Sequence, residues 1–235
     1  MQIAIIGHST VLIETAGMRI LTDPYFGKNV GPAFIRLRPP SQTREQLNDV
    51  DLVLISHSHW DHIDLAYLRS LENRTQIVTS ALTEGLIKVI GTKRIISLRP
   101  WSEQQCDGVK ITVVPAVHMV PTIGFIIQGE DKTIYFAGDT FCGDFMKTIA
   151  QSFQLDVALM PVTTFRVPMT MGVKQALEAV EVLKPKVVIP IHLGIDARLP
   201  FMRTGQTAEQ FEEKVKESCL DCRVVMLKEG ESYSV

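Results

Sequence analysis

Four potential metal ligands stand close together in this sequence, directly after a short apolar run. The segment reads Ile55-Ser56-His57-Ser58-His59-Trp60-Asp61-His62. Side chains at positions i and i+2 of an extended chain point to the same side, so His57 and His59 can reach one ion. Asp61 and His62 are adjacent in the following turn and point differently, so they can serve a second ion. A fold for this chain must therefore bring further ligands to this segment.

The alternative to a metal site is a polar turn that happens to be rich in His, in which backbone carbonyl groups satisfy each imidazole. Histidines that cluster with carboxylates more often bind metal. Imidazole and carboxylate ligands at roughly 2.0 to 2.2 Å suit zinc, and manganese or iron accept the same set.

Three further candidate ligands each lie just past an apolar run: His118, Asp139 and His192. Strand ends are where α/β proteins place their sites. Gly138 would let the backbone bend and bring the Asp139 carboxylate inward. Each residue alone is more often a hydrogen-bonded structural group. Together with the first segment they make more ligands than the roughly four that one tetrahedral zinc uses, so we expect two divalent metal ions, zinc first.

The apolar pattern along the chain predicts an α/β fold. Both strand and helix patterns occur in each half of the chain, which indicates two sheets packed face to face with helices outside. No linker separates the halves, so we expect a single domain over residues 1–235. The expected strands are residues 2–6, 10–14, 18–22, 52–55, 77–79, 95–98, 109–114, 125–128, 133–137, 155–160, 187–191 and 224–227 and one near Tyr233. The expected helices are residues 65–71, 82–89, 173–183 and 208–218.

Two segments are expected to be loops that shape a pocket. Residues 24–45 contain four prolines and several basic side chains, and residues 195–206 follow the last candidate ligand. Loops this long within a compact domain are usually functional or mobile. A hairpin turn is expected at Gly129-Glu130-Asp131.

Charge and hydropathy exclude several classes of partner. The net charge is −2, and no basic block occurs, which argues against nucleic acid or an anionic membrane surface. No apolar run approaches the roughly 18 residues that span a bilayer, so no stable membrane insertion is expected. The segment from Met1 to Ser9 reads as a first strand and not as a signal peptide. The four cysteines are then best read as free thiols, and a cytoplasmic location is expected.

The order of these motifs resembles that of the metallo-β-lactamase superfamily. The residues that carry the resemblance are His57-x-His59-x-Asp61-His62, a lone His118, a Gly138-Asp139-Thr140 turn and a late Pro190-Ile191-His192. Gly7-His8-Ser9-Thr10 and Leu21-Thr22-Asp23-Pro24 are similar to the branch that contains ascorbate-6-phosphate lactonase and N-acylphosphatidylethanolamine phospholipase D. The resemblance implies a four-layer αββα sandwich and a metal-dependent hydrolase. The segment Val162-Thr163-Thr164-Phe165-Arg166 lacks the glycines usual in the branch, so the pocket is expected to differ.

The resemblance also implies a role for each candidate ligand. One ion would be held by His57, His59 and His118, and the other by Asp61, His62 and His192, with Asp139 as the bridge. Asp61, Asp139 and His192 are the ligands expected to act in catalysis. Two such ions activate water at neutral pH.

The expected reaction is hydrolysis of a phosphodiester, lactone or related ester of an anionic small molecule. An alternative is an iron-dependent oxidoreductase on the same scaffold, although the chain lacks an appended flavin domain. A binding protein with a vestigial site is a third reading, against which the complete ligand set argues. Assembly into a homo-oligomer stays open.

Four residues are candidates for contact with substrate: His8, Arg166, Arg198 and Arg203. Arginine binds phosphate through two hydrogen bonds, which motivates the three arginines. They would otherwise solvate loops or pair with Asp196 and Glu209. His8 and Asp23 would alternatively orient a metal ligand or satisfy loop backbone groups. Cys142 and the pair Cys219 and Cys222 are expected to be ordinary thiols.

Overall fold

Backbone pairing arranges the strands in two seven-stranded sheets and one small three-stranded sheet. The computed structural model describes residues 1–89, 91 and 94–235. The first sheet has the order β17-β1-β2-β3-β6-β7-β8, and the second has the order β16-β14-β13-β12-β11-β10-β9. The bounds in the first sheet are β1 Gln2–Gly7, β2 Thr10–Thr15, β3 Met18–Thr22, β6 Leu52–Leu54, β7 Gln76–Thr79, β8 Ile95–Ser97 and β17 Ser232–Ser234. Those in the second are β9 Glu103–Cys106, β10 Val109–Pro115, β11 Ile123–Gly129, β12 Lys132–Phe136, β13 Val157–Pro161, β14 Val187–Ile191 and β16 Arg223–Val224.

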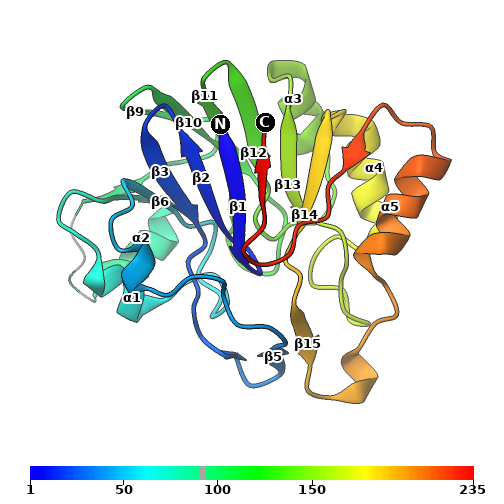
Figure 1. Cartoon of the computed structure of the whole chain (residues 1–235), viewed down its shortest axis with the longest axis horizontal. Coiled ribbons are helices and arrows are strands. Elements are labelled where there is room, and N and C mark those ends of the chain that lie inside the picture. The colour runs from blue at the N-terminus through cyan, green and yellow to red at the C-terminus, as the bar shows by residue number, and fades with distance from the viewer. Residues whose placement is uncertain (90, 92–93) are drawn as a thin grey trace.

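The two large sheets pack face to face with helices outside, as Figure 1 shows. α1 (Leu65–Ser70) and α2 (Ala81–Lys88) cover the first sheet. α3 (Phe145–Ser152), α4 (Val173–Leu183) and α5 (Ala208–Glu217) cover the second. Two single turns of 3-10 helix occur at Glu45–Leu47 and Pro200–Met202. The predicted αββα sandwich is therefore confirmed.

Side-chain alternation along the strands builds the central core. Ile3 and Ile5 of β1 and Phe125 and Ile127 of β11 belong to one buried apolar cluster between the sheets. The intervening residues of both strands, such as Ile126, point to the outer layers and pack against the helices. Because side chains alternate between the two faces of a strand, the same strands supply the central apolar layer between the sheets and the two outer layers beneath the helices.

β9 and α3 are missing from the expected elements of the two large layers. α3 was not predicted, because only Met146 and Ile149 of its eight residues are buried and so short a helix gives little periodic signal. The predicted hairpin turn is confirmed, since Glu130 and Asp131 join β11 to β12 with φ of 51° and 57°.

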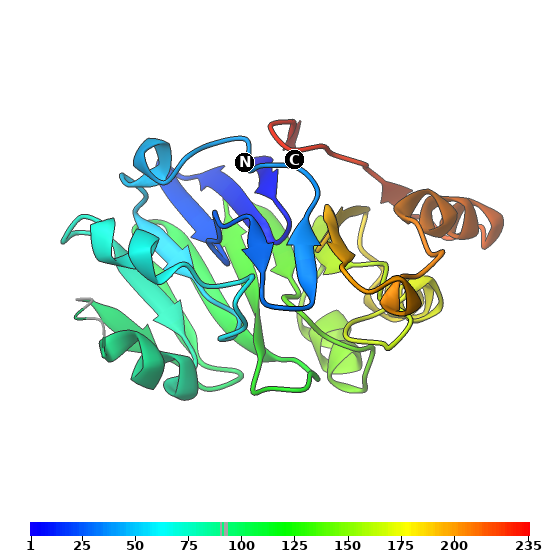
Figure 2. The same cartoon turned by 90° about the horizontal axis from the view of Figure 1, so that it is seen from below.

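A third sheet lies inside the segments that we expected to be loops. β4 (Asn29–Val30) pairs with β5 (Phe34–Arg36), and β5 pairs with β15 (Ile195–Ala197). Strands of two or three residues are too short to show alternation in a sequence, and the pairing of β5 with β15 joins segments distant along the chain. We call residues 29–36 the flap. In Figure 1, β5 and β15 lie together below the two large sheets, and Figure 2 shows the flap in front of them.

None of the helices in the described part of the chain is long and apolar enough to cross a bilayer.

Candidate metal centre

Every candidate metal ligand follows the carboxyl end of a strand. The segment His57 to His62 follows β6, and His118, Asp139 and His192 follow β10, β12 and β14. β12 and β14 both run parallel to β13, and β10 runs in the same direction because two antiparallel pairings separate it from β12. The carboxyl ends of these strands therefore meet at one edge of the sandwich, where the first sheet contributes His57 to His62.

The backbone at this edge takes left-handed conformations that turn side chains inward. Gly138 has a φ of 59°, which confirms the predicted bend before Asp139. A Cβ atom at Gly138 would lie 2.7 Å from the Cβ of Ser56, so no larger residue fits. His192 and His8 also have positive φ, 60° and 59°, and the His192 amide donates to the His8 carbonyl at 3.2 Å. Such strain outside glycine typically occurs at functional sites.

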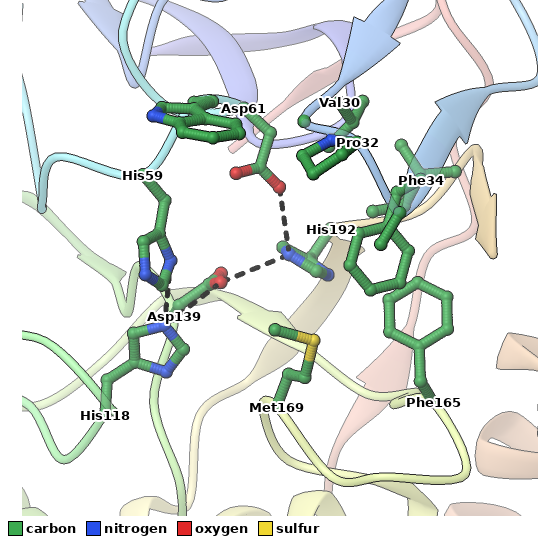
Figure 3. A pocket seen from close by; sticks show the side chains of 14 residues that line it. Val30, Pro32, Phe34, His59, Asp61, His118, Asp139, Phe165, Met169 and His192 are labelled. Carbon is green, nitrogen blue, oxygen red and sulfur yellow. Dashed lines mark hydrogen bonds and ion pairs between the residues drawn. The ribbon is translucent and has the colours of Figure 1, made fainter. Parts of the chain in front are cut away.

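Imidazoles and carboxylates gather in two groups, from which Figure 3 shows His59, His118 and Asp139 of one and Asp61 and His192 of the other. One group contains His57, His59, His118 and Asp139, and the other contains His8, Asp61, His62 and His192. The structure thus brings together all seven residues that the sequence singled out as ligands. It adds His8, which the sequence analysis had not considered as a member of the cluster.

The separations between these ligand atoms match the edges of a metal coordination shell. With bonds of roughly 2.0 to 2.1 Å, tetrahedral ligands lie roughly 3.3 Å apart. His59 Nδ1 lies 3.2 Å from His118 Nε2, and His192 Nε2 lies 3.2 Å from Asp139 Oδ2. His62 Nε2 lies 3.4 Å from Asp139 Oδ1 and 3.7 Å from Asp61 Oδ2. The donor set therefore fits divalent cations.

Several buried polar atoms in this space have no hydrogen-bond partner among the described residues. They include His57 Nε2, His62 Nε2 and Asp139 Oδ1. Buried polar atoms are normally hydrogen-bonded, and an unsatisfied one costs roughly 1 to 3 kcal/mol. Three unsatisfied atoms at one point are accounted for if each is a ligand to a cation.

Asp23 orients the ligand segment from behind. Its carboxylate accepts hydrogen bonds from the amide of Ser56 at 2.7 Å and from the hydroxyl of Ser56 at 2.6 Å. Its Oδ2 atom also lies 2.7 Å from His62 Nδ1. A proton on Nδ1 of His62 leaves Nε2 as the atom that faces the cluster, a common arrangement at zinc sites.

His8 performs a similar task for Asp61. Its Nε2 lies 3.1 Å from Asp61 Oδ2, its side chain is buried, and it does not line the cavity over the cluster. Its Nδ1 also lies 3.3 Å from the carbonyl oxygen of Leu193. Of the three roles predicted for His8, the structure therefore supports orientation of a ligand and a contact with the loop backbone, and it does not place His8 in the lining where substrate would bind.

Burial adjusts the protonation of this cluster. It lowers the pKa of His118 to about 4, and it also lowers the pKa values of His57 and His59. Burial alone would raise the pKa of Asp139, but His192 and His62 hold it well below the ordinary value. Three neutral imidazoles and an ionised carboxylate at neutral pH are the forms that bind metal.

A cavity of about 260 Å³ opens above the cluster and ends at the flap. His59, Asp61, His118, Asp139 and His192 form its floor. The remaining lining residues are Val30, Gly31, Pro32, Ala33, Phe34, Trp60, Phe165, Met169 and Ile195.

The three arginines predicted to grip substrate lie outside this lining. Arg203 pairs with Asp196 at 3.1 Å, as the alternative interpretation proposed. Arg198 donates to the Asn29 side chain at 2.7 Å and its amide donates to the Ala33 carbonyl, so it holds the flap. Arg166 is exposed. The structure therefore does not bring the predicted arginines to the ligand cluster.

None of the four cysteines belongs to the ligand groups or lines the cavity above them. Cys219 is exposed, and Cys142 and Cys222 are half-buried. Burial raises the pKa of the Cys222 thiol to about 11, which disfavours the reactive thiolate.

Comparisons of the sequence and of the structure with known proteins both lead to metal-dependent hydrolases. A family model described as the beta-lactamase superfamily domain matches residues 18–193. A UPF0173 metal-dependent hydrolase of Methanopyrus kandleri is 31% identical over an alignment of 247 positions that covers 99% of each chain. A second UPF0173 metal-dependent hydrolase, from Pyrococcus abyssi, is 29% identical and covers 100% of this chain and 99% of its own.

Among solved structures, a metallo hydrolase from the archaeon Ignicoccus hospitalis superposes with a TM-score of 0.79 at 25% identity, over 100% of this chain and 98% of its own.

Proposed function

Because this chain belongs to the beta-lactamase superfamily and is a metal-dependent hydrolase, we propose that it uses a dinuclear centre to cleave an ester-type bond of a small molecule. In this proposal His57, His59 and His118 hold one ion, and Asp61, His62 and His192 hold the other. Asp139 bridges the two, and zinc is the first candidate metal. Bound there, two divalent ions supply a nucleophilic water at neutral pH and polarise the bond to be cleaved.

The observation that carries this proposal is the spacing of the ligand atoms. Asp139 Oδ2 lies 3.9 Å from His57 Nε2 and 3.8 Å from His118 Nε2 on one side. The same atom lies 3.2 Å from His192 Nε2 on the other side. One carboxylate between two sets of imidazoles is the arrangement that a bridging ligand requires.

The proposed reaction is the hydrolysis of a phosphodiester, a lactone or a related ester. The oxygen of water forms a bond to phosphorus or to the carbonyl carbon, the bond to the leaving oxygen breaks, and that oxygen takes a proton. A serine nucleophile is disfavoured here, because the hydroxyl of Ser56, next to the ligand His57, is buried and donates to Asp23. The chain's own contribution is to hold and orient the ligands and to surround the reacting bond.

An anionic substrate fits this centre if its charge lies at the bond to be cleaved. Ligands Asp61 and Asp139 carry two negative charges, and two divalent ions would leave the floor of the cavity positive. The metal ions would then attract the negative charge of the substrate, a role predicted from the sequence for the three arginines.

The experiment measures metal content together with hydrolysis. Zinc-reconstituted protein is expected to hold close to two ions per chain and to hydrolyse members of a panel of aryl phosphodiesters, lactones and aryl esters. Asp139→Asn is expected to lose at least a hundredfold in kcat/KM. Asp144→Asn is the matched control, because Asp144 is exposed and pairs with the exposed Lys147. A stoichiometry that stays at one, or an Asp139→Asn variant with wild-type rate, would overturn the proposal.

A further inference from the structure

The cavity above the ligand cluster has a polar floor and an apolar wall. All of its ionisable lining residues belong to the ligand cluster. Among the described residues, no lysine or arginine side chain lines it. The wall offers a single side-chain hydrogen-bond donor, the indole of Trp60.

The flap supplies half of this wall and is held in place from several sides. β15 pairs with β5 through Asp196↔Ile35 and Ala197↔Phe34. The Phe34 ring lies against the Phe165 ring with centroids 4.5 Å apart. The flap is therefore bonded to the strand that follows His192, so its position over the cluster is fixed by the same segment that carries a ligand.

The cations on and beside the flap lie outside the lining of the cavity. Arg198 donates to Asn29, and Arg203 pairs with Asp196. Arg36, buried on β5, donates to the carbonyl of Tyr25 at 2.8 Å and lies over the Tyr25 ring. A second negative group on the substrate would thus find no cation among the described residues that line the wall, and its desolvation would cost energy.

We propose that this wall binds a neutral apolar substituent of the substrate, aromatic or aliphatic, while the bond to be cleaved lies on the ligand floor. The inference rests on the proposed function, because it places the reacting bond at the metal ligands. A cavity of about 260 Å³ has room for such a group, since an apolar cavity of about 150 Å³ accepts a benzene ring. Phe34, Phe165 and Trp60 are the residues that determine this specificity.

A neighbouring hollow of about 320 Å³ is a poorer place for this substituent. It lies beyond Phe165 and His192 and is lined by Thr163, Thr164, Thr204 and Thr207 among others. Apart from His192, none of the seven predicted ligands lines it.

Binding tests the inference without any need for turnover. In a Trp101→Phe background, Trp60 is the one remaining tryptophan of the two in the chain, so its fluorescence reports on the cavity. Zinc-loaded protein is titrated with acetate, butanoate, hexanoate and octanoate. Affinity is expected to rise roughly three- to fourfold per methylene until the cavity is filled. An affinity that is independent of chain length would overturn the inference.

Two variants locate the effect in the wall. Phe165→Ala is expected to weaken octanoate binding about tenfold and to leave acetate binding unchanged. Phe201→Ala is the matched control, because Phe201 is 65% exposed and lies outside the cavity. Ala33→Leu adds bulk to the wall and is expected to lower the chain length at which affinity stops rising. Equal losses for Phe165→Ala and Phe201→Ala would refute the assignment.

Hydrolysis of a matching series of 4-nitrophenyl acyl esters separates the two proposals. Absence of turnover on these esters and on the whole panel of phosphodiesters and lactones, together with an intact binding series, would contradict the proposed function and leave this inference standing. Turnover with equal kcat/KM for acetyl and hexanoyl esters would support the proposed function and contradict this inference.

Discussion

Asp23 shows how a residue that touches no substrate can control the centre. Its carboxylate accepts from the Ser56 amide, the Ser56 hydroxyl and His62 Nδ1, so it fixes the start of the ligand segment and the orientation of one imidazole. Its signal in the sequence was weak, a single acidic residue at a strand end. Only the structure shows that it lies behind His62.

We expect Asp23→Asn to lower zinc affinity by roughly 10- to 100-fold, the usual effect of losing a carboxylate that orients a metal-binding histidine. The amide oxygen cannot accept from all three donors, and His62 is then free to rotate. Competition with a fluorescent chelator measures the affinity. Asp49→Asn is the control, since Asp49 is 51% exposed and pairs with Arg19. Equal affinities for the two variants would contradict this role.

Burial of the histidines makes the stability of the metal-free protein depend on pH. Burial lowers the pKa of His8 and of His118 from 6.5 to about 4, so below pH 6.5 the unfolded chain binds protons that the folded chain does not. Stability is therefore lost as pH falls from 6.5 toward 4. His62 acts in the opposite sense, because Asp139, Asp61 and Asp23 outweigh its burial and raise its pKa. The pKa values of His57 and His59 are also lowered, so the net effect of a fall in pH is a loss of stability.

Melting of chelator-treated protein at pH 7, 6 and 5 checks this expectation, with a Tm that falls at each step. His8→Gln should show a shallower fall than the wild type. A Tm that rises between pH 7 and pH 5 would show that the histidines are not held neutral.

At the level of elements, the flap depends on a glycine. Gly31 has a φ of 62°, and a Cβ atom there would lie 2.8 Å from Cε3 of Trp60. Gly17 has a similar φ of 76° with nothing within 4 Å of its Cβ position. The two glycines therefore share backbone strain and differ in contact with the cavity wall.

We expect Gly31→Ala and Gly17→Ala each to lose about 1 kcal/mol of stability from the left-handed backbone. Only Gly31→Ala should also displace Trp60 and change KM and the Trp60 emission maximum. Chemical denaturation and steady-state kinetics on the same samples measure both. A changed KM in Gly17→Ala, or none in Gly31→Ala, would argue against a flap that packs on Trp60.

The elements differ in how far the sequence could predict them. Strands such as β10 to β12 carry enough buried residues for their pattern to show, and the candidate ligands were found because they follow such strands. The flap and β15 have two or three residues per strand, and their pairing joins positions more than 150 residues apart. The arginines were misplaced for this reason, because an arginine that bonds a flap and one that faces a substrate look the same in a sequence.

On the scale of the whole molecule, the ligand cluster joins the two large sheets. His57 to His62 come from the first sheet, while His118, Asp139 and His192 come from the second. Ions held by both sets would bind the folded chain and not the unfolded one, so they would stabilise the fold by mass action.

Removal of metal is therefore expected to lower Tm by roughly 10 °C, which corresponds to about 4 kcal/mol at a ligand excess of about 1,000 Kd. Calorimetry with and without a chelator measures the shift. His192→Ala should lose one of the two ions and retain part of the shift. An identical Tm for loaded and stripped protein would mean that the ions do not connect the sheets.

The position of the flap also bears on how such a chain can diverge. Its residues Val30 to Phe34 line the wall of the cavity, and none of the seven predicted metal ligands lies among them. None of them belongs to the central core cluster either. Apart from Gly31, whose backbone conformation favours glycine, substitutions there can therefore accumulate with little cost to folding or to the metal ligands. Related chains that keep the same centre are free to acquire different substrates through changes in this one turn.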